Sequence, residues 1–112
     1  MDRIIDKPWG REELLEVNDH YVVKALFINA GHRLSLQFHE VKQETIFVHE
    51  GKINLYLDHT SFPAKTLSEK QYYTIPPKAV HRFEAIEDSI IIECSTPELT
   101  DVVRLEDDYD RS

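Results

Sequence analysis

The fold is decided by residues 31–44, which read GHRLSLQFHEVKQE and are followed by a further glycine, Gly51. Three potential metal ligands, Gln37, His39 and Glu44, fall within one strand-turn-strand pattern. Side chains alternate between the two faces of a strand, so Gln37 and His39 share one face with a serine. The opposite face then carries apolar side chains: Leu34, Leu36 and Phe38. A polar face of ligand-type side chains, backed by an apolar face, is typical of a site inside a β-barrel.

Size and composition restrict the class of protein. A chain of 112 residues is long enough for one modest hydrophobic core, so we expect a single domain over residues 1–112. The formal net charge of -8 argues against a nucleic-acid partner, because phosphate backbones require a basic surface. A small phosphorylated ligand stays open, since a local pair of basic residues can offset a distant acidic surface.

Cysteine content and hydropathy predict the compartment. The single cysteine, Cys94, cannot form an internal disulfide, so nothing requires an oxidising environment. Its apolar neighbours predict a small core residue. The first residues lead into no long apolar segment, and no apolar run could span a bilayer. We therefore expect a soluble, cytoplasmic protein without a membrane partner.

Alternation and turn residues predict a chain built from short strands. The expected strands cover residues 13–17, 21–28, 34–39, 44–49, 53–58, 71–75, 81–85 and 89–94. Asn18-Asp19 is a plausible hairpin connection between the first two, and Pro76-Pro77 ends the sixth. Residues 99–105 fit either a short helix or an edge strand. Many short strands separated by turns predict an all-β sandwich or barrel.

The potential ligands form a chemically coherent set. Gln37 and His39 stand two residues apart on one strand face, and a short turn would fold Glu44 back beside His39. His81 is a fourth candidate, at the start of a later strand. Two imidazoles and a carboxylate are common ligands of zinc or iron(II), and a glutamine oxygen can complete the set. The alternative is a group of polar residues lining a barrel mouth.

This spacing resembles the two sequence motifs of the cupin family. The first motif is glycine, five residues, His-x-His, three or four residues, glutamate, six residues and glycine; it matches Gly31 to Gly51 except that Gln37 replaces the first histidine. The second motif, Pro-x-Gly-x-x-His followed four residues later by asparagine, matches Pro76 to His81. Lys78 stands in place of its glycine, and Ala85 in place of its asparagine. The resemblance implies a cupin-type β-barrel, that is, a double-sheet jelly roll.

A narrower resemblance covers nearly the whole chain. The runs 34–39 (LSLQFH), 75–76 (IP) and 81–84 (HRFE) look like the cupin domain of type II mannose-6-phosphate isomerases, and so do the flanking runs 7–10 (KPWG) and 101–107 (DVVRLED). In that family the domain often follows a nucleotidyltransferase domain, which these 112 residues do not contain. The resemblance implies interconversion of an aldose phosphate and a ketose phosphate, with Gln37, His39, Glu44 and His81 holding a divalent metal. Zinc is the expected ion; iron, manganese, cobalt and nickel are the alternatives.

Candidate catalytic and substrate residues follow from the same resemblance. Glu44 and Arg82 are the candidate catalytic residues, although alternation turns Arg82 away from His81, and a structural salt bridge is its alternative role. Basic residues near the motifs could hold the phosphate of a sugar phosphate: Arg33, Lys42 and Lys78, with Arg82 as a fourth. Family members carry arginine where this chain has Lys42, and histidine where it has Thr45. A lysine keeps the charge but loses the planar fork that grips phosphate.

Three classes of function stay open at this point. The first is a sugar-phosphate isomerase, for which the general base is not identified; Glu84 and Glu93 are merely close to the motifs. The second is a cupin with other chemistry, such as an iron-dependent oxygenase. The third is a non-catalytic sugar-binding module. Because exposed strand edges in small barrels are commonly covered by a partner subunit, we also expect a homodimer.

Overall fold

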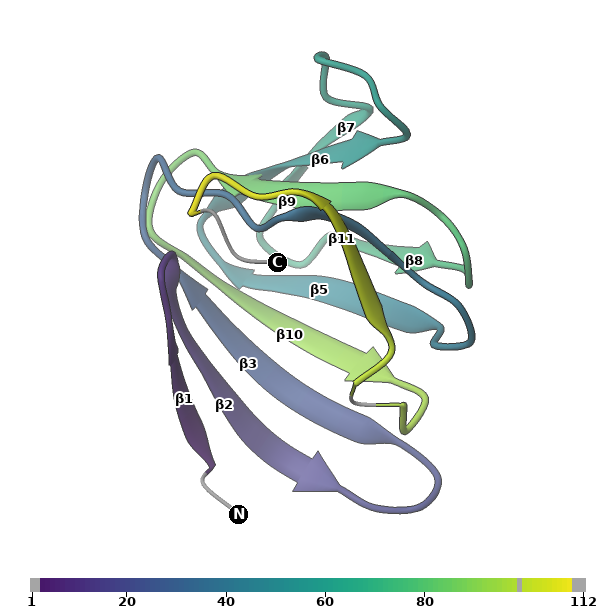
Figure 1. Cartoon of the computed structure of the whole chain (residues 1–112). Coiled ribbons are helices and arrows are strands. Elements are labelled where there is room, and N and C mark those ends of the chain that lie inside the picture. The colour runs from purple at the N-terminus through teal and green to yellow at the C-terminus, as the bar shows by residue number, and fades with distance from the viewer. Residues whose placement is uncertain (1–2, 99, 110–112) are drawn as a thin grey trace.

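In a computed structural model of the chain, which describes residues 3–98 and 100–109, the backbone forms two antiparallel β-sheets facing each other (Figure 1). The six-stranded sheet contains, in spatial order, β1 (Ile4–Lys7), β2 (Gly10–Val17), β3 (Val22–Ile28), β10 (Ser89–Ser95), β5 (Glu44–Glu50) and β8 (Tyr72–Ile75). The five-stranded sheet contains β11 (Val102–Glu106), β4 (Leu36–His39), β9 (His81–Ala85), β6 (Lys52–Leu57) and β7 (Lys65–Ser68).

The predicted all-β, double-sheet architecture is confirmed, and no helix occurs among the described residues. The hairpin at Asn18 is confirmed as well: its side-chain oxygen accepts hydrogen bonds from the backbone N–H groups of His20 and Tyr21. Two strands were not predicted from the sequence: β1 (Ile4–Lys7) and β7 (Lys65–Ser68). Of the ambiguous segment 99–105, Leu99 lies outside the described residues, and residues 102–105 belong to edge strand β11 rather than to a helix.

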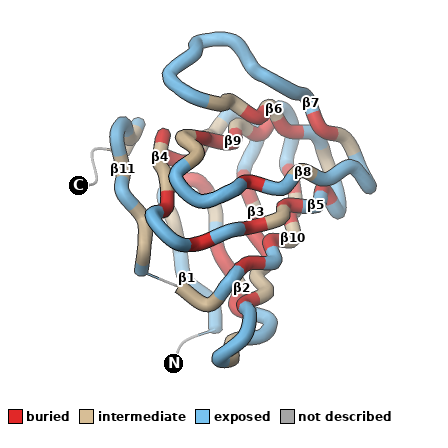
Figure 2. The backbone as a smooth tube through the Cα atoms, turned by 90° about the vertical axis from the view of Figure 1, so that its right-hand side faces the viewer, coloured by how far each residue is buried: buried red, intermediate tan, exposed pale blue. Residues whose placement is uncertain are grey.

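The space between the sheets has an apolar end and a polar end. Along β5 the inward residues run from Val48 and Ile46 to Glu44, and along β9 from Phe83 to His81. The inward residues of β10 and β3 also change from apolar to polar along the strand. The antiparallel pairing of β3, β10 and β5 brings these changes to the same end of the interior. Buried positions therefore line the interior of both sheets, as Figure 2 shows in red. The apolar end is the hydrophobic core, and the polar end can form a functional site.

Some residues predicted for one face lie on the other. Leu34 is buried in the hydrophobic core instead of facing outward, because β4 begins only at Leu36 and the alternation does not extend back through residues 34–35. Cys94 is exposed, not a core residue, because it faces away from the interior of the six-stranded sheet. Phe47 lies on that same outer face and is 36% exposed, whereas Phe83 is buried in the core.

The described residues contain no helix of the length and hydropathy needed to cross a membrane. The expected homodimer stays a prediction. The outer face of the six-stranded sheet is one surface that a second copy could cover, since Phe47 and the strongly exposed Tyr72 stand opposite each other on β5 and β8.

Candidate metal centre

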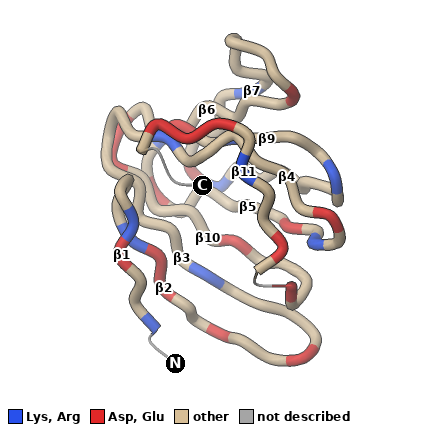
Figure 3. The backbone as a smooth tube through the Cα atoms, in the orientation of Figure 1, with Lys and Arg blue, Asp and Glu red and all other residues tan. Residues whose placement is uncertain are grey.

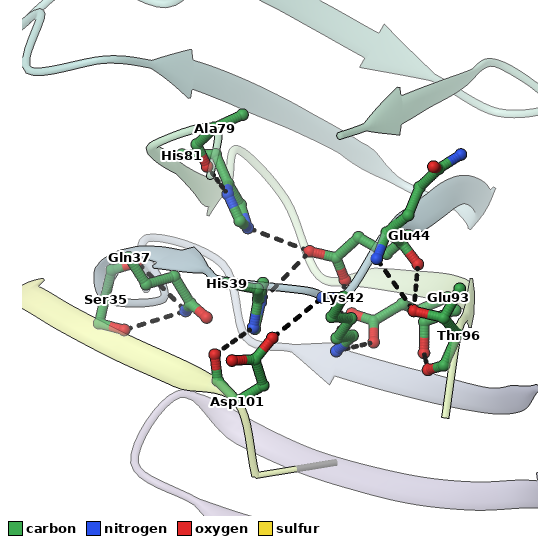
Figure 4. A network of polar contacts seen from close by, with 12 residues as sticks. Ser35, Gln37, His39, Lys42, Glu44, Ala79, His81, Glu93, Thr96 and Asp101 are labelled. Carbon is green, nitrogen blue, oxygen red and sulfur yellow. Dashed lines mark hydrogen bonds and ion pairs between the residues drawn. The ribbon is translucent and has the colours of Figure 1, made fainter. Parts of the chain in front are cut away.

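Three potential ligands meet at the polar end of the interior. His39 ends β4, Glu44 begins β5, and His81 begins β9. One nitrogen or oxygen atom from each lies within 4.8 Å of the others, and all three side chains are buried. His81 Nε2 is 3.1 Å from Glu44 Oε1, and His39 Nε2 is 3.6 Å from the same oxygen (Figure 4). The structure thus brings together three of the four predicted ligands from three different strands.

The two imidazole rings are oriented by backbone carbonyl groups. His81 Nδ1 lies 2.9 Å from the carbonyl oxygen of Ala79, and His39 Nδ1 lies 3.3 Å from that of Asp101. A carbonyl accepts, so each Nδ1 carries the proton, and each Nε2 presents its lone pair to Glu44 when the ring is neutral. This is the outer-shell arrangement found behind metal-bound histidines.

The donor set therefore fits a cation. Two lone pairs and a carboxylate oxygen repel one another at these distances unless a proton or a metal ion lies between them. Burial lowers the pKa of His39, and this outweighs the opposing effect of Glu44, so His39 is held in the neutral, ligating form. Two nitrogens and one carboxylate oxygen suit zinc or another divalent ion of that series.

Gln37 occupies the neighbouring position on the same inner face. It stands directly opposite His81 across the β4–β9 pair and lines the same cavity as the three ligands. Its amide nitrogen donates to Ser35 Oγ at 3.0 Å, and in Figure 4 its amide oxygen points away from Ser35. With this assignment of the amide, the oxygen is available as the fourth ligand that the sequence predicts.

A cavity of about 140 Å³ lies in front of these residues. Figure 3 shows Lys and Arg positions scattered over the described chain, yet four basic side chains come together at this cavity: Lys7, Lys24, Lys42 and Arg104. They face three carboxylates, Glu12, Glu44 and Glu93. With a divalent cation bound, the cavity of this acidic protein would be strongly positive, which favours an anionic ligand.

Lys42 connects the ligand cluster to a second buried carboxylate. Its Nζ lies 3.1 Å from Glu93 and 3.7 Å from Glu44, and only 5% of the residue is exposed. Burial, followed by the charge of Glu44, raises the pKa of Glu93 to about 8. Burial alone would raise the pKa of Glu44, but its contacts with His81 and Glu93 and the charge of Lys42 lower it. Glu44 is thus the ionised member of the pair and Glu93 the protonated one.

Replacing Lys42 by methionine is expected to lower the free energy of unfolding by about 3 kcal/mol or more, because the change leaves buried Glu44 without its nearest cationic partner. Lys78→Met is the matched control: Lys78 is exposed and does not line this cavity, so its loss should cost less than about 0.5 kcal/mol. Urea unfolding of both variants measures the difference. Equal midpoints would show that the contacts of Lys42 with Glu44 and Glu93 add no net stability.

The other predicted site residues lie elsewhere. Lys78 is in an exposed turn, where its backbone N–H donates to the His39 carbonyl at 2.6 Å. Arg33 and Arg82 are on the opposite face of the five-stranded sheet, in a second cavity. Alternation places Arg82 correctly, since its neighbour His81 faces inward and Arg82 faces out. Of the candidate phosphate-binding residues, only Lys42 lines the cavity of the metal centre.

Sequence reasoning missed several residues of this centre. The Asp101 carboxylate accepts hydrogen bonds from the backbone N–H groups of Val41 and Lys42, at 2.8 and 2.9 Å, and so holds the turn before Glu44. Arg104 on β11 stands opposite Gln37 and lines the cavity. One signal was present for Lys24: a charged residue at an inward position of an otherwise apolar strand, VVKALFI.

Solved structures with the same arrangement of strands define the class. The structure of KdgF from Halomonas sp. superimposes with a TM-score of 0.77 at 19% identity, covering 88% of each chain. An RmlC-like cupin from Shewanella frigidimarina gives a TM-score of 0.77 at 20% identity, covering 88% of this chain and 86% of that one. Double-sheet fold and ligand motif together define a cupin, as the sequence predicted.

Within the cupins, the family described as "Mannose-6-phosphate isomerase C-terminal" matches residues 1–107, and the chain belongs to it. Among curated relatives, the alginate biosynthesis protein AlgA of Pseudomonas aeruginosa is 33% identical over 95% of this chain and 22% of its own length. Mannose-1-phosphate guanylyltransferase ManC of Salmonella typhimurium is 29% identical over 99% of this chain and 24% of its own length. The chain thus spans about a quarter of the length of these relatives.

Proposed function

We propose that the chain is a metal-dependent aldose–ketose isomerase acting on a sugar phosphate, with mannose 6-phosphate as the expected substrate. The observation that carries the proposal is the single cavity that joins His39, Glu44 and His81 to four basic side chains. The family to which the chain belongs supports the substrate class. His39, Glu44 and His81 would hold the divalent ion, with Gln37 as the fourth ligand and zinc as the expected metal.

The contacts of each residue in the cavity indicate the role it would have in the reaction. A divalent ion bound there would supply Lewis acidity to the sugar oxygens at C1 and C2. Lys7, Lys42 and Arg104 provide positive charge for the phosphate dianion. Isomerisation by proton transfer also needs a base that takes the proton from C2 and returns it to C1, whereas a hydride shift would need none. Since Glu44 is assigned to the metal, this role falls to another carboxylate.

Glu93 is our candidate for that proton transfer. Both Glu12 and Glu93 line the cavity, but Glu12 is paired with two lysines, Lys24 and Lys7, whereas Glu93 is paired with Lys42 alone, which also contacts the ligand candidate Glu44. Glu84, the other carboxylate close to the sequence motifs, faces away from the metal centre and accepts a hydrogen bond from Tyr56. Glu44 therefore keeps its predicted place at the centre as a metal ligand. Glu93, which is protonated while its pKa is about 8, would act as base once a bound divalent cation lowers that pKa and leaves the carboxylate ionised.

The test measures conversion of mannose 6-phosphate to fructose 6-phosphate by the zinc-loaded chain. We expect turnover by the parent and a fall in kcat of about 10²-fold or more for Glu93→Gln, with metal content unchanged. Glu84→Gln is the matched control and should keep the parent's kcat. A metal-loaded parent that binds the sugar phosphate without converting it would contradict the isomerase and favour a sugar-binding module.

A further inference from the structure

A second cavity, of about 300 Å³, lies behind the metal centre on the outer face of the five-stranded sheet. Leu36 and Arg82 line it, and their strand neighbours Gln37 and His81 face the metal centre on the other side. The cavity also contains Arg33 from the segment before β4, and Thr60 and Ser61 from the loop between β6 and β7. The two arginines and these hydroxyl-bearing residues thus line one space that the metal chemistry does not use.

Arg82 is fixed in this cavity with an unused donor. The residue is 5% exposed, and its Nε donates to the carbonyl of Leu34 at 3.0 Å. Its buried Nη2 has no hydrogen-bond partner among the described residues. The nearest carboxylates, from Glu106 and Asp108, stand 3.8 and 3.6 Å from its terminal nitrogens, which is too far for a hydrogen bond. A buried donor without an acceptor is costly, so the position favours an incoming acceptor.

Arg33 shows how the cavity holds an oxyanion. Its Nε and Nη2 donate to the two carboxylate oxygens of Asp108, at 2.5 and 2.9 Å, in the parallel arrangement that guanidinium groups form with carboxylate or phosphate. Asp108 comes from the segment after β11, and its side chain is 38% exposed. Glu84, also close to Arg33, is already bonded to Tyr56 at 2.7 Å. The replaceable group is therefore the Asp108 carboxylate.

We propose that this cavity is a binding site for a phosphate group, carried by a small molecule that displaces Asp108 from Arg33. A phosphate has more charge and more acceptor oxygens than one carboxylate, so it can bond Arg33 and the unused Nη2 of Arg82 at once. The hydroxyl group of Ser61 adds a donor on the loop side, whereas that of Thr60 already donates to the backbone carbonyls of Leu57 and Phe62. Glu106 also lines the cavity, so binding depends on the exchange with Asp108 and not on a positive surface. The site does not depend on the proposed isomerase activity.

Inorganic phosphate, titrated into the full chain and followed by backbone amide NMR shifts, tests the proposal. The shifts should centre on residues 33, 60, 61 and 82. Arg33→Ala should weaken binding about tenfold, the loss expected for one charge-assisted hydrogen-bond pair. Asp108→Asn should instead strengthen it, because the competing charge is gone, and it leaves buried Arg82 intact. Lys78→Ala is the control and should match the parent.

Two further titrants identify the source of the phosphate. Mannose 6-phosphate binding tighter than inorganic phosphate at these residues supports a sugar-phosphate ligand, and equal affinity supports free phosphate. Unphosphorylated mannose should leave the shifts of residues 33 and 82 unchanged. The proposal is overturned if the shifts are confined to residues around His39, or if the parent, Arg33→Ala and Asp108→Asn bind phosphate with one affinity.

Discussion

Replacing His39 or His81 by alanine is expected to lower the affinity for zinc more than about 100-fold, beyond the effect of losing an outer-shell partner. Each change removes one of the two candidate nitrogen ligands, which lie 3.1 and 3.6 Å from the same oxygen of Glu44. Only one imidazole then remains beside that carboxylate. At zinc concentrations about 100 times the parent's dissociation constant, the parent should gain about 2.7 kcal/mol of stability and the variants almost none. Metal content after dialysis and zinc-dependent melting measure both effects.

His59→Ala is the control for both histidine variants. His59 is exposed in the loop after β6 and lines the second cavity, away from the three ligands. It should therefore retain the parent's metal content and the parent's stabilisation by zinc. Equal metal content in all three variants would refute the assignment of His39 and His81 as ligands.

The grouping of Gln37, His39 and Glu44 could be predicted because it depends on local rules. Alternation fixes Gln37 and His39 on one face, and a short turn returns the chain so that Glu44 lies beside them. His81 required more, because no local rule brings residue 81 beside residue 37; the motif resemblance supplied that pairing, and the β4–β9 register shows it. The ion pair of Lys42 and Glu93 was not predicted for the same reason. The two residues are 51 positions apart, and only the packing of the sheets brings them together.

Alternation tells which residues share a face, but not whether that face is covered. The run Ile90-Ile91-Ile92 is apolar on both faces, so it gives no sign that Cys94 points to solvent. Phe47 is exposed for the same reason, since no described element covers the outer face of β5. The short strand β7 sits in a polar segment whose sequence, KTLS, has a single apolar residue to indicate it. These errors arise because the sequence of one strand does not show which other elements pack against it.

Gly10→Ala is expected to cause a larger loss of stability than Lys42→Met or either histidine variant. Gly10 begins β2 with a φ of +152°, and a Cβ at this position would lie 1.8 Å from the carbonyl oxygen of Phe27. That oxygen is backbone on the paired strand β3 and cannot move aside as a flexible side chain would. Either the β2–β3 pairing opens or the turn carrying buried Trp9 shifts, and we expect a loss of about 4 kcal/mol or more of the free energy of unfolding.

Gly31→Ala separates this close approach from the general cost of a left-handed backbone. Gly31 has a φ of +82°, but a Cβ there would meet no atom within 4 Å. Its replacement should cost only the conformational strain, about 1 to 2 kcal/mol. Urea midpoints of the two variants give the comparison, and equal losses would show that the contact with Phe27 is not what requires glycine. Because Lys7 and Trp9 both line the metal cavity, Gly10→Ala should also weaken zinc binding, whereas Gly31→Ala should not.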